Sequence, residues 1–311
     1  MNSKIFKSLL SILISVFLIY LLIININLKK VLDIILSFNK EFIATFFLLF
    51  FIALNLRAFI WKNLLANISN ELHFRHLIAG EGLGFAINSF LPLRSGDLLR
   101  GLYISKISNL PFPSVLVSIA TEQLLDFFTV LTLGLFCLCA GVKIAINILL
   151  LPIAMTMVFL ILFFLSMFIR KRFEHFKVRF PKFWLLIHPF LSLTRSGVFK
   201  KVFIANILCL LLISLGILLL YFNLLGKFLF IESLISTFFI NIGLLSFGIW
   251  VASKQYGIDF DDATGIFFIY QITIIFVSLS TFLLVTLYDI LITIKTKITS
   301  TFSDKGGTIP P

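Results

Sequence analysis

The chain has 311 residues, of which 60% are hydrophobic and 13% are charged, and its mean hydropathy is +1.11. Soluble domains are about 25% charged and about 45–50% apolar, so this composition excludes a soluble globular protein, a disordered chain and a disulfide-rich secreted scaffold. The absence of an alternating apolar and polar pattern excludes an outer-membrane barrel. The remaining class is an all-α, polytopic helical membrane protein. Its 26 Lys and Arg against 14 Asp and Glu suit an anionic membrane leaflet rather than nucleic acid.

Apolar runs long enough to cross a bilayer, about 20 residues, predict the membrane helices. In chain order they are 5–28, 42–60, 113–140, 144–169, 201–222 and 266–293. The first run is too long for a signal peptide and lacks a small-residue cleavage site, so we expect it to remain as a span. Two further stretches, 77–105 and 232–257, are apolar but broken by glycine, proline or polar residues. Such breaks favour re-entrant structure, so we predict about six to eight transmembrane helices with two broken or re-entrant hairpins.

The positive charges predict the orientation. If 77–105 enters the membrane from the cytoplasm and 232–257 from outside, 17 of the 26 Lys and Arg lie on the cytoplasmic side, as the positive-inside rule requires. We therefore expect a multi-pass protein of the inner (cytoplasmic) membrane with both termini in the cytoplasm. A single membrane domain is predicted over 1–298 and a disordered tail over 299–311. The basic cytoplasmic loop 170–200 is either an interfacial amphipathic helix or a loop that only sets topology.

Seven ionisable side chains interrupt the apolar sequence. An Asp, Lys or Arg at the centre of a membrane helix costs about 2.5–3.5 kcal/mol, so these groups must pair or contact water. By default such residues mark a functional site. They are Arg57, Glu81, Arg94, Asp97, Arg100, Glu122 and Asp126.

Spacing divides these charges into two sets. Arg94, Asp97 and Arg100 follow one another at intervals of three and share roughly one helix face. Asp97 can hold one arginine and leave the other guanidinium free to bind a lipid phosphate bidentately. Glu122 and Asp126 are four residues apart on one face and need a counter-cation, for which the three arginines are available. The other interpretation is a purely structural ion-pair network that locks broken helices together.

No catalytic residue, metal site or cofactor is predicted. The cysteines, Cys137, Cys139 and Cys209, lie in apolar runs without metal-ligand spacing, as buried cysteines do. No pairing of a nucleophile with a base and no glycine-rich phosphate loop is recognisable.

At the charged segment the sequence resembles the transmembrane region of the lysylphosphatidylglycerol synthase family, also called flippase-like membrane proteins. That family carries an Asn near a Pro-x-Arg-x-Gly-(Asp/Glu)-x-x-Arg segment and, about twenty residues later, Glu-(Arg)-x-x-Asp. The matching positions of the first motif are Asn88, Pro92, Arg94, Gly96, Asp97 and Arg100, and those of the second are Glu122, Gln123 and Asp126. The resemblance covers roughly 10–295. It weakens near the C-terminus, where Gly248 and Gln271 stand in place of the family's Glu and Arg.

This resemblance implies a stand-alone member that lacks the synthases' aminoacyltransferase domain. The expected function is non-enzymatic: a flippase-like protein that moves or binds a phospholipid or polyprenyl-phosphate-linked lipid, with Arg94, Asp97 and Arg100 at the phosphate. Arg57, Glu81, Glu122 and Asp126 would form the charge network. The alternatives are a membrane-embedded lipid headgroup or glycosyl transferase component, and an anchor for a separately encoded transferase. The expected partners are thus the membrane, an anionic lipid and, in the last alternative, that transferase.

Overall fold

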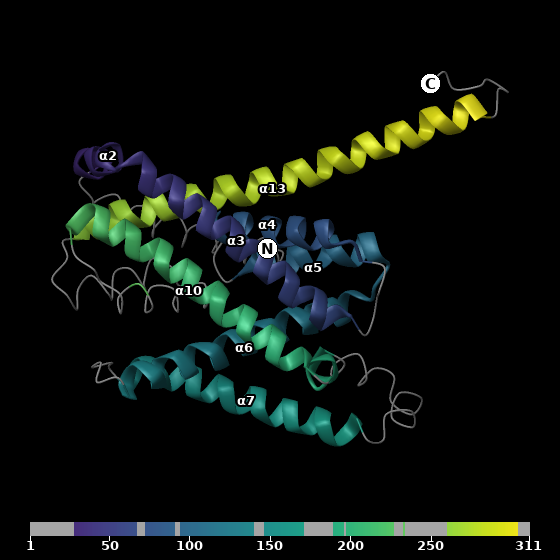
Figure 1. The fold of residues 1–311 in the computed structure, drawn as a ribbon, viewed down its shortest axis with the longest axis horizontal. Helices are drawn as coiled ribbons and strands as arrows, with labels where there is room; N and C mark the ends of the chain where they lie inside the picture. The colour runs from purple at the N-terminus through teal and green to yellow at the C-terminus, as the bar shows by residue number, and fades with distance from the viewer. Residues whose placement is uncertain are drawn as a thin grey trace, which may run out of the picture. The chain divides into compact units, whose positions relative to one another are not determined.

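The computed structural model describes residues 28–66, 72–90, 94–139, 146–170, 189–195, 197–226, 233 and 260–303. In these ranges every regular element is a helix (Figure 1). Among the described residues, four helices are long and apolar enough to cross a membrane, over Lys40–Leu65, Phe112–Leu135, Val198–Leu224 and Thr264–Ile294. The prediction of an all-α, polytopic membrane protein is therefore confirmed. The predicted span 5–28, the broken stretch 232–257 and most of the loop 170–200 lie outside the described residues.

Four predicted spans match observed helices to within a few residues. They are α3 (Lys40–Leu65), α6 (Phe112–Cys139), α7 (Ile146–Arg170) and α10 (Val198–Leu225). The last helix, α13 (Phe260–Ser303), is 44 residues long and extends well beyond the predicted span 266–293. It continues past residue 298 into the segment predicted to be disordered, because no glycine or proline occurs between Gly265 and Gly306 to stop it.

One helix was not predicted. The ten-residue α2 (Leu28–Ser37) follows directly after the first apolar run. Lys29 and Asp33 are exposed on it whereas Ile34 is buried. A single helix turn places residues three or four apart on one face, so α2 is a short amphipathic helix. Its length is well below the roughly 20 residues that a transmembrane helix needs.

The chain divides into two compact units. The first takes its described residues from Met1–Phe46 and Ser214–Thr273. Within it the Phe46 and Tyr270 rings stack with centroids 5.5 Å apart. Gly265 provides room for Ile34, because a Cβ at Gly265 would lie 2.6 Å from Ile34 Cγ2. Close packing of α2 against the start of α13 thus depends on that glycine.

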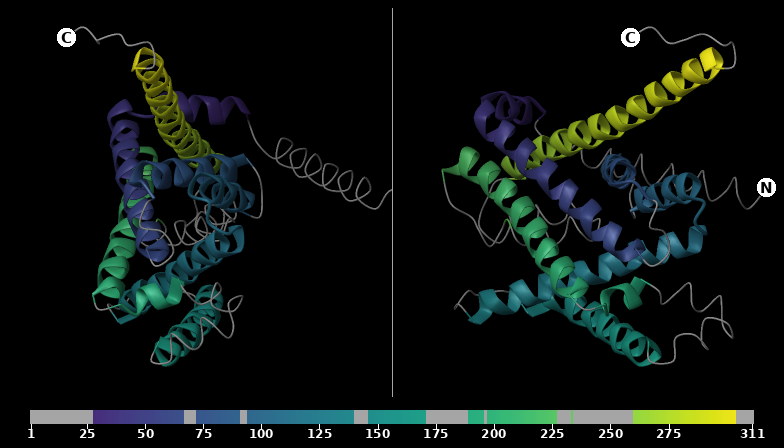
Figure 2. Two further views of the ribbon diagram at one scale, coloured as in Figure 1. Left: turned by 90° about the vertical axis from the view of Figure 1, so that its right-hand side faces the viewer. Right: turned by 45° about the vertical axis from the view of Figure 1, so that its right-hand side comes forward.

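The second unit, Phe47–Ile213 with Ile274–Pro311, contains all seven of the predicted intramembrane charges. In this unit α6 packs along α7, and α4 (Phe74–Phe90) packs along α5 (Ser95–Ser108) (Figure 2). One of its cores joins α3, α6, α7 and α10 with residues 189–193. Its aromatic centre is a cluster of phenylalanines: Phe128, Phe159, Phe190, Phe199 and Phe203.

The predicted broken stretch 77–105 is a pair of short helices. With 17 and 14 residues, α4 and α5 are each shorter than a helix that spans a bilayer. They pack against each other, as expected for a helical hairpin.

Apolar side chains cover the outside of the second unit. Phe164 and Phe168 on α7 are 63% and 69% exposed, and Leu284 on α13 is 67% exposed. Arg57, by contrast, is only 3% exposed. An apolar exterior around buried charges is the distribution that a hydrocarbon surrounding requires.

Candidate functional site: an ion-pair cluster in the second unit

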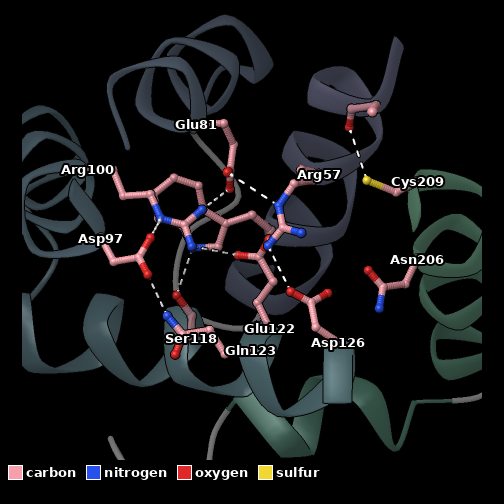
Figure 3. A network of polar contacts seen from close by, with 12 residues as sticks. Arg57, Glu81, Asp97, Arg100, Ser118, Glu122, Gln123, Asp126, Asn206 and Cys209 are labelled. Carbon is pink, nitrogen blue, oxygen red and sulfur yellow. Dashed lines mark hydrogen bonds and ion pairs between the residues drawn. The ribbon is translucent and has the colours of Figure 1, made fainter. Parts of the chain in front are cut away.

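The second unit brings together charged residues that lie far apart in the sequence. Arg57 comes from α3, Glu81 from α4, Arg100 from α5, and Glu122 and Asp126 from α6 (Figure 3). None of the five is more than 3% exposed. Glu122 and Asp126 are neighbours because they are one helical turn apart. The other contacts form because four helices, α3, α4, α5 and α6, pack around the same point.

At its centre, two arginines and two glutamates form a closed ring of ion pairs. Arg57 Nη2 lies 2.7 Å from Glu122 Oε1, and Arg100 Nη2 lies 3.1 Å from Glu122 Oε2. On the other side of the two guanidinium groups (Figure 3), Glu81 pairs closely with Arg100 Nη1, and Arg57 Nε lies 3.8 Å from its Oε2. Each glutamate therefore bridges both arginines. Because breaking a buried pair leaves an uncompensated charge, this ring ties α3, α4, α5 and α6 together.

Asp126 is the least compensated carboxylate of the cluster. Its Oδ2 lies 3.1 Å from Arg57 Nη2, the same nitrogen that contacts Glu122. Its Oδ1 is buried and has no hydrogen-bond partner. Arg57 Nη1 is likewise buried without a partner. The cluster thus retains unused hydrogen-bonding capacity on both signs of charge.

The remaining two charges lie at the rim. Asp97 Oδ1 is 3.0 Å from Arg100 Nε, and Gln123 Nε2 donates to Asp97 Oδ2 at 2.5 Å. Arg94 Nη1 is 3.9 Å from Asp97 Oδ2, at the limit of an ion pair, and the Arg94 side chain is 19% exposed. Arg100 is thus held by three carboxylates, whereas Arg94 has only a long contact. The structure brings together all seven sequence-predicted charges but gives the two motif arginines very different surroundings.

The backbone of the motif explains how α5 can approach α4 so closely. Asn88 Oδ1 accepts a hydrogen bond from the backbone N–H of Gly96 at 2.8 Å, near the first turn of α5. A Cβ at Gly96 would collide with the carbonyl oxygen of Gly84 and with Asn88. Arg94 itself precedes α5 in the left-handed region, with φ 53°. Pro92 lies outside the described residues.

Aromatic rings enclose the two inner arginines. Arg100 Cζ lies 4.9 Å from the centre of the Trp61 ring, and Arg57 Cζ lies 5.5 Å from the centre of the Phe85 ring. Trp61 Nε1 donates to Ser118 Oγ at 2.9 Å, which fixes the indole. Trp61 and Ser118 were not predicted from the sequence to belong to the site. Trp61 could have been found, because it is four residues after Arg57 and so lies on the same face of α3.

A small cavity adjoins the cluster. Its volume is about 20 Å³, and its lining includes Arg57, Gly84, Asn88, Arg94 and Arg100. That is room for about one water molecule and is too small for a phosphate group. Within the described part of the chain, no group of three or more His, Cys, Asp or Glu is arranged to hold a metal ion.

A second, larger hollow lies between α5 and α13. Its volume is about 410 Å³, and most of its surface is apolar; it is lined by Tyr103, Ile107, Phe282, Thr286, Asp289, Ile290, Thr293 and Ile294. Asp289 pairs with Arg75 Nε at 3.1 Å and lies 3.4 Å from His76 Nδ1. Burial is the main cause that lowers the pKa of His76 below its usual range, and Asp289 opposes this shift. The hollow is thus apolar along its length and polar at Asp289.

Comparisons with known proteins agree with this architecture. A UPF0104 membrane protein of Methanocaldococcus jannaschii is 25% identical over 143 residues, which cover 44% of this chain and 43% of that protein. The match thus spans less than half the length of that relative. No solved structure matches the chain. The family model described as the lysylphosphatidylglycerol synthase transmembrane region matches residues 8–252. Because that match covers most of the sequence, the chain is a multi-pass membrane protein that belongs to the lysylphosphatidylglycerol synthase transmembrane-region family.

Proposed function

We propose that this protein binds and moves an anionic phospholipid or a polyprenyl-phosphate-linked lipid, with the guanidinium of Arg94 as the headgroup contact. The observation that carries the proposal is the contrast between two arginines. Arg100 is saturated by Glu81, Asp97 and Glu122, whereas Arg94 has one carboxylate at 3.9 Å and is partly exposed. A guanidinium with free donors can bind a phosphate through two parallel hydrogen bonds.

The other charged residues would position this contact. Asp97 lies between Arg94 and Arg100 and is held by Gln123, so it can orient the Arg94 side chain. Arg100 would fix Asp97 rather than meet the lipid itself. The inner ring of Arg57, Glu81, Arg100 and Glu122 would hold the four helices in register around the rim. In this proposal the inner ring has the structural role and the Arg94 rim has the lipid-binding role.

The hollow between α5 and α13 supports the lipid class. Tyr103, which lines it, is one turn of α5 beyond Arg100. An acyl chain needs an apolar surface of this kind beside a polar headgroup site. We propose that the protein lies in the inner (cytoplasmic) membrane with both termini in the cytoplasm, in agreement with the positive-inside rule.

A transport assay tests the headgroup contact. The full-length protein is reconstituted into phosphatidylcholine vesicles that contain a fluorescent phosphatidylglycerol tracer, and the exchange of tracer between leaflets is measured by chemical bleaching of the outer leaflet. Replacing Arg94 by Ala removes charge-assisted hydrogen bonds of about 1.5–3 kcal/mol, so binding should weaken about 10- to 100-fold. Lys106→Ala, an exposed cation on the same hairpin, is the matched control. Equal tracer exchange by wild type and Arg94→Ala would reject the proposal.

The alternative role, an anchor or component for a separately encoded lipid or glycosyl transferase, gives a different result. The purified protein would then leave the tracer in place, and Arg94→Ala would change nothing. Lipid mass spectrometry on the detergent-purified protein would separate the two candidates further. A bound phosphate lipid that is present in wild type and lost in Arg94→Ala supports the headgroup site.

A further inference from the structure

The charges of the buried cluster do not balance. Two guanidinium groups, on Arg57 and Arg100, face three carboxylates, on Glu81, Glu122 and Asp126, and none of the five is more than 3% exposed. At the rim Arg94 and Asp97 cancel each other. If every group were ionised, the cluster would carry one net negative charge. A net charge buried in an apolar surrounding is costly and is normally neutralised by a bound proton or cation.

The packed helices around the cluster supply no further cation among the described residues. From α10, Cys209 Sγ approaches the carbonyl oxygen of Ala53 at 3.6 Å, and Asn206 donates to Thr129 Oγ1 at 2.9 Å. From α13, the backbone of Ser278 approaches Gly82 on α4. Apart from the thiol of Cys209, these groups do not titrate. Within the described ranges, the titratable and charged groups that face the carboxylates are therefore the three arginines, the four acids themselves and Cys209.

The unpartnered oxygen of Asp126 is a site at which a neutralising proton can bind. Its Oδ1 is buried without a hydrogen bond, and its Oδ2 shares Arg57 Nη2 with Glu122. The two carboxylates thus compete for one nitrogen while an oxygen beside them has no donor. A carboxyl hydrogen on either group would turn a repelling pair of carboxylates into an acid and a carboxylate, which can share a hydrogen bond.

We propose that the three buried carboxylates, on Glu81, Glu122 and Asp126, form a proton-binding site that holds one exchangeable proton and couples it to the arrival of an anionic headgroup at Arg94. Binding transfers one proton from a hydronium ion to one carboxylate: an O–H bond of the hydronium breaks, an O–H bond of the carboxyl group forms, water is released, and the cluster becomes neutral. Because the acids are close together, the proton belongs to the group as a whole. The coupling rests on the proposed headgroup site, but the proton site does not.

The direction of the coupling follows from charge. A phosphate at Arg94 places a negative group beside the cluster and so favours the protonated state. By reciprocity, the protonated cluster favours binding of the phosphate. Proton and anionic lipid would therefore bind together, and a proton gradient would bias the direction in which the lipid moves.

Infrared spectroscopy on the full-length, detergent-purified protein tests the proton site. The C=O stretch of a carboxylic acid absorbs at a different infrared frequency from the stretches of a carboxylate, so the two forms can be distinguished. We expect an acid band at neutral pH in the wild type. Any change that removes one negative charge or adds one positive charge should abolish it: Asp126→Asn, Glu81→Gln and Gln123→Arg. Asp289→Asn, outside the cluster, is the control and should keep the band. Size-exclusion elution confirms that each variant is folded.

Two results would overturn the proton site. One is the absence of an acid band in the wild type at neutral pH, which would mean that a bound cation balances the charge or that the cluster keeps its net negative charge. The other is a band that persists in the folded forms of all three neutralising variants. Gln123→Arg retains every carboxylate, so it remains informative if removal of a buried acid prevents folding.

A second titration separates the coupling from the proposed function. Phosphatidylglycerol in mixed micelles should raise the midpoint pH of the band by about one to two units, corresponding to a typical coupling between sites, and Arg94→Ala should remove this shift. If phosphatidylglycerol binds through Arg94 but leaves the midpoint unchanged, the coupling is wrong while the headgroup site stands. If wild type and Arg94→Ala bind it equally, the proposed headgroup contact is wrong while the proton site stands.

Discussion

Gln123 on α6 donates a hydrogen bond from Nε2 to Asp97 Oδ2 on α5 at 2.5 Å. The amide thus holds the carboxylate that lies 3.0 Å from Arg100 Nε and 3.9 Å from Arg94 Nη1. The family pattern that this chain resembles allows an arginine at the position of Gln123. A neutral amide satisfies Asp97 Oδ2 without adding a cation that would compete with the two arginines for this carboxylate.

We expect Gln123→Leu to weaken lipid binding, although Arg94, the proposed lipid contact, is unchanged. Asp97 Oδ2 would lose its donor and draw the Arg94 guanidinium inward, away from the rim. Because a hydrogen bond to a charged group contributes about 1.5–3 kcal/mol, the free energy of unfolding in detergent should also fall by an amount of that order. Phosphatidylglycerol binding and thermal unfolding measure the two effects. Thr132→Val, an exposed substitution on the same helix, should change neither. Unaltered lipid binding in Gln123→Leu would mean that Asp97 does not orient Arg94.

Arg57 should contribute strongly to the stability of the second unit. It pairs with Glu81, Glu122 and Asp126, and all are buried. Arg57→Met would leave three carboxylates with one guanidinium, at a cost of about 3–5 kcal/mol in the free energy of unfolding. Denaturant titration of the purified protein measures this loss.

The control for Arg57 is Lys62→Met, which removes an exposed cation from the same helix. Its contact with the Phe74 ring, 6.0 Å from the ring centre, contributes at most about 1 kcal/mol at an exposed site, well below the loss expected for Arg57→Met. Arg57→Met combined with Asp126→Asn should be more stable than Arg57→Met alone, since one unpaired acid is removed. Equal stability of the single and double variants would contradict a charge-based explanation.

Gly96→Ala should separate α5 from α4. The added methyl group would meet the Gly84 carbonyl oxygen and Asn88 Oδ1, neither of which is the flexible end of a long side chain. Overpacking of this kind costs about 1–3 kcal/mol, so we expect a lower unfolding temperature. Gly101→Ala on the same helix is a milder change, because its neighbours are side-chain ends at 3.3 Å or more. A larger loss in Gly101→Ala than in Gly96→Ala would show that α4 and α5 do not pack in this way.

His76 should make the stability depend on pH. Burial lowers its pKa below the ordinary value of 6.5, so between the two values the unfolded chain binds a proton that the folded chain does not. The free energy of unfolding therefore falls as the pH drops through 6.5. His76→Gln should remove this contribution. Relative to wild type, the variant should therefore become more stable as the pH is lowered from 7.5 to about 5.5. If the free energy of unfolding depends on pH in the same way in both proteins, His76 is not the cause of the pH dependence.

The sequence by itself determined the class of the protein and the position of its helices. Continuous apolar runs fixed α3, α6, α7 and α10 to within a few residues, because the cost of exposing backbone polar groups to hydrocarbon leaves few alternatives. Regular spacing also paired Glu122 with Asp126, one helical turn apart. The amphipathic α2 and the full length of α13 were missed, since neither is needed to cross the membrane and propensity sets their ends only weakly.

Only the tertiary structure decided which charge meets which. Arg57 is 69 residues from Asp126 and Arg100 is 19 from Glu81, and no local period relates such positions. Their contact depends on the rotation and depth of four packed helices. That packing saturates Arg100 and leaves Arg94 at the rim, although the motif presents the two arginines as equivalent. It also gathers seven dispersed charges into one cluster, five of them buried and two at its rim.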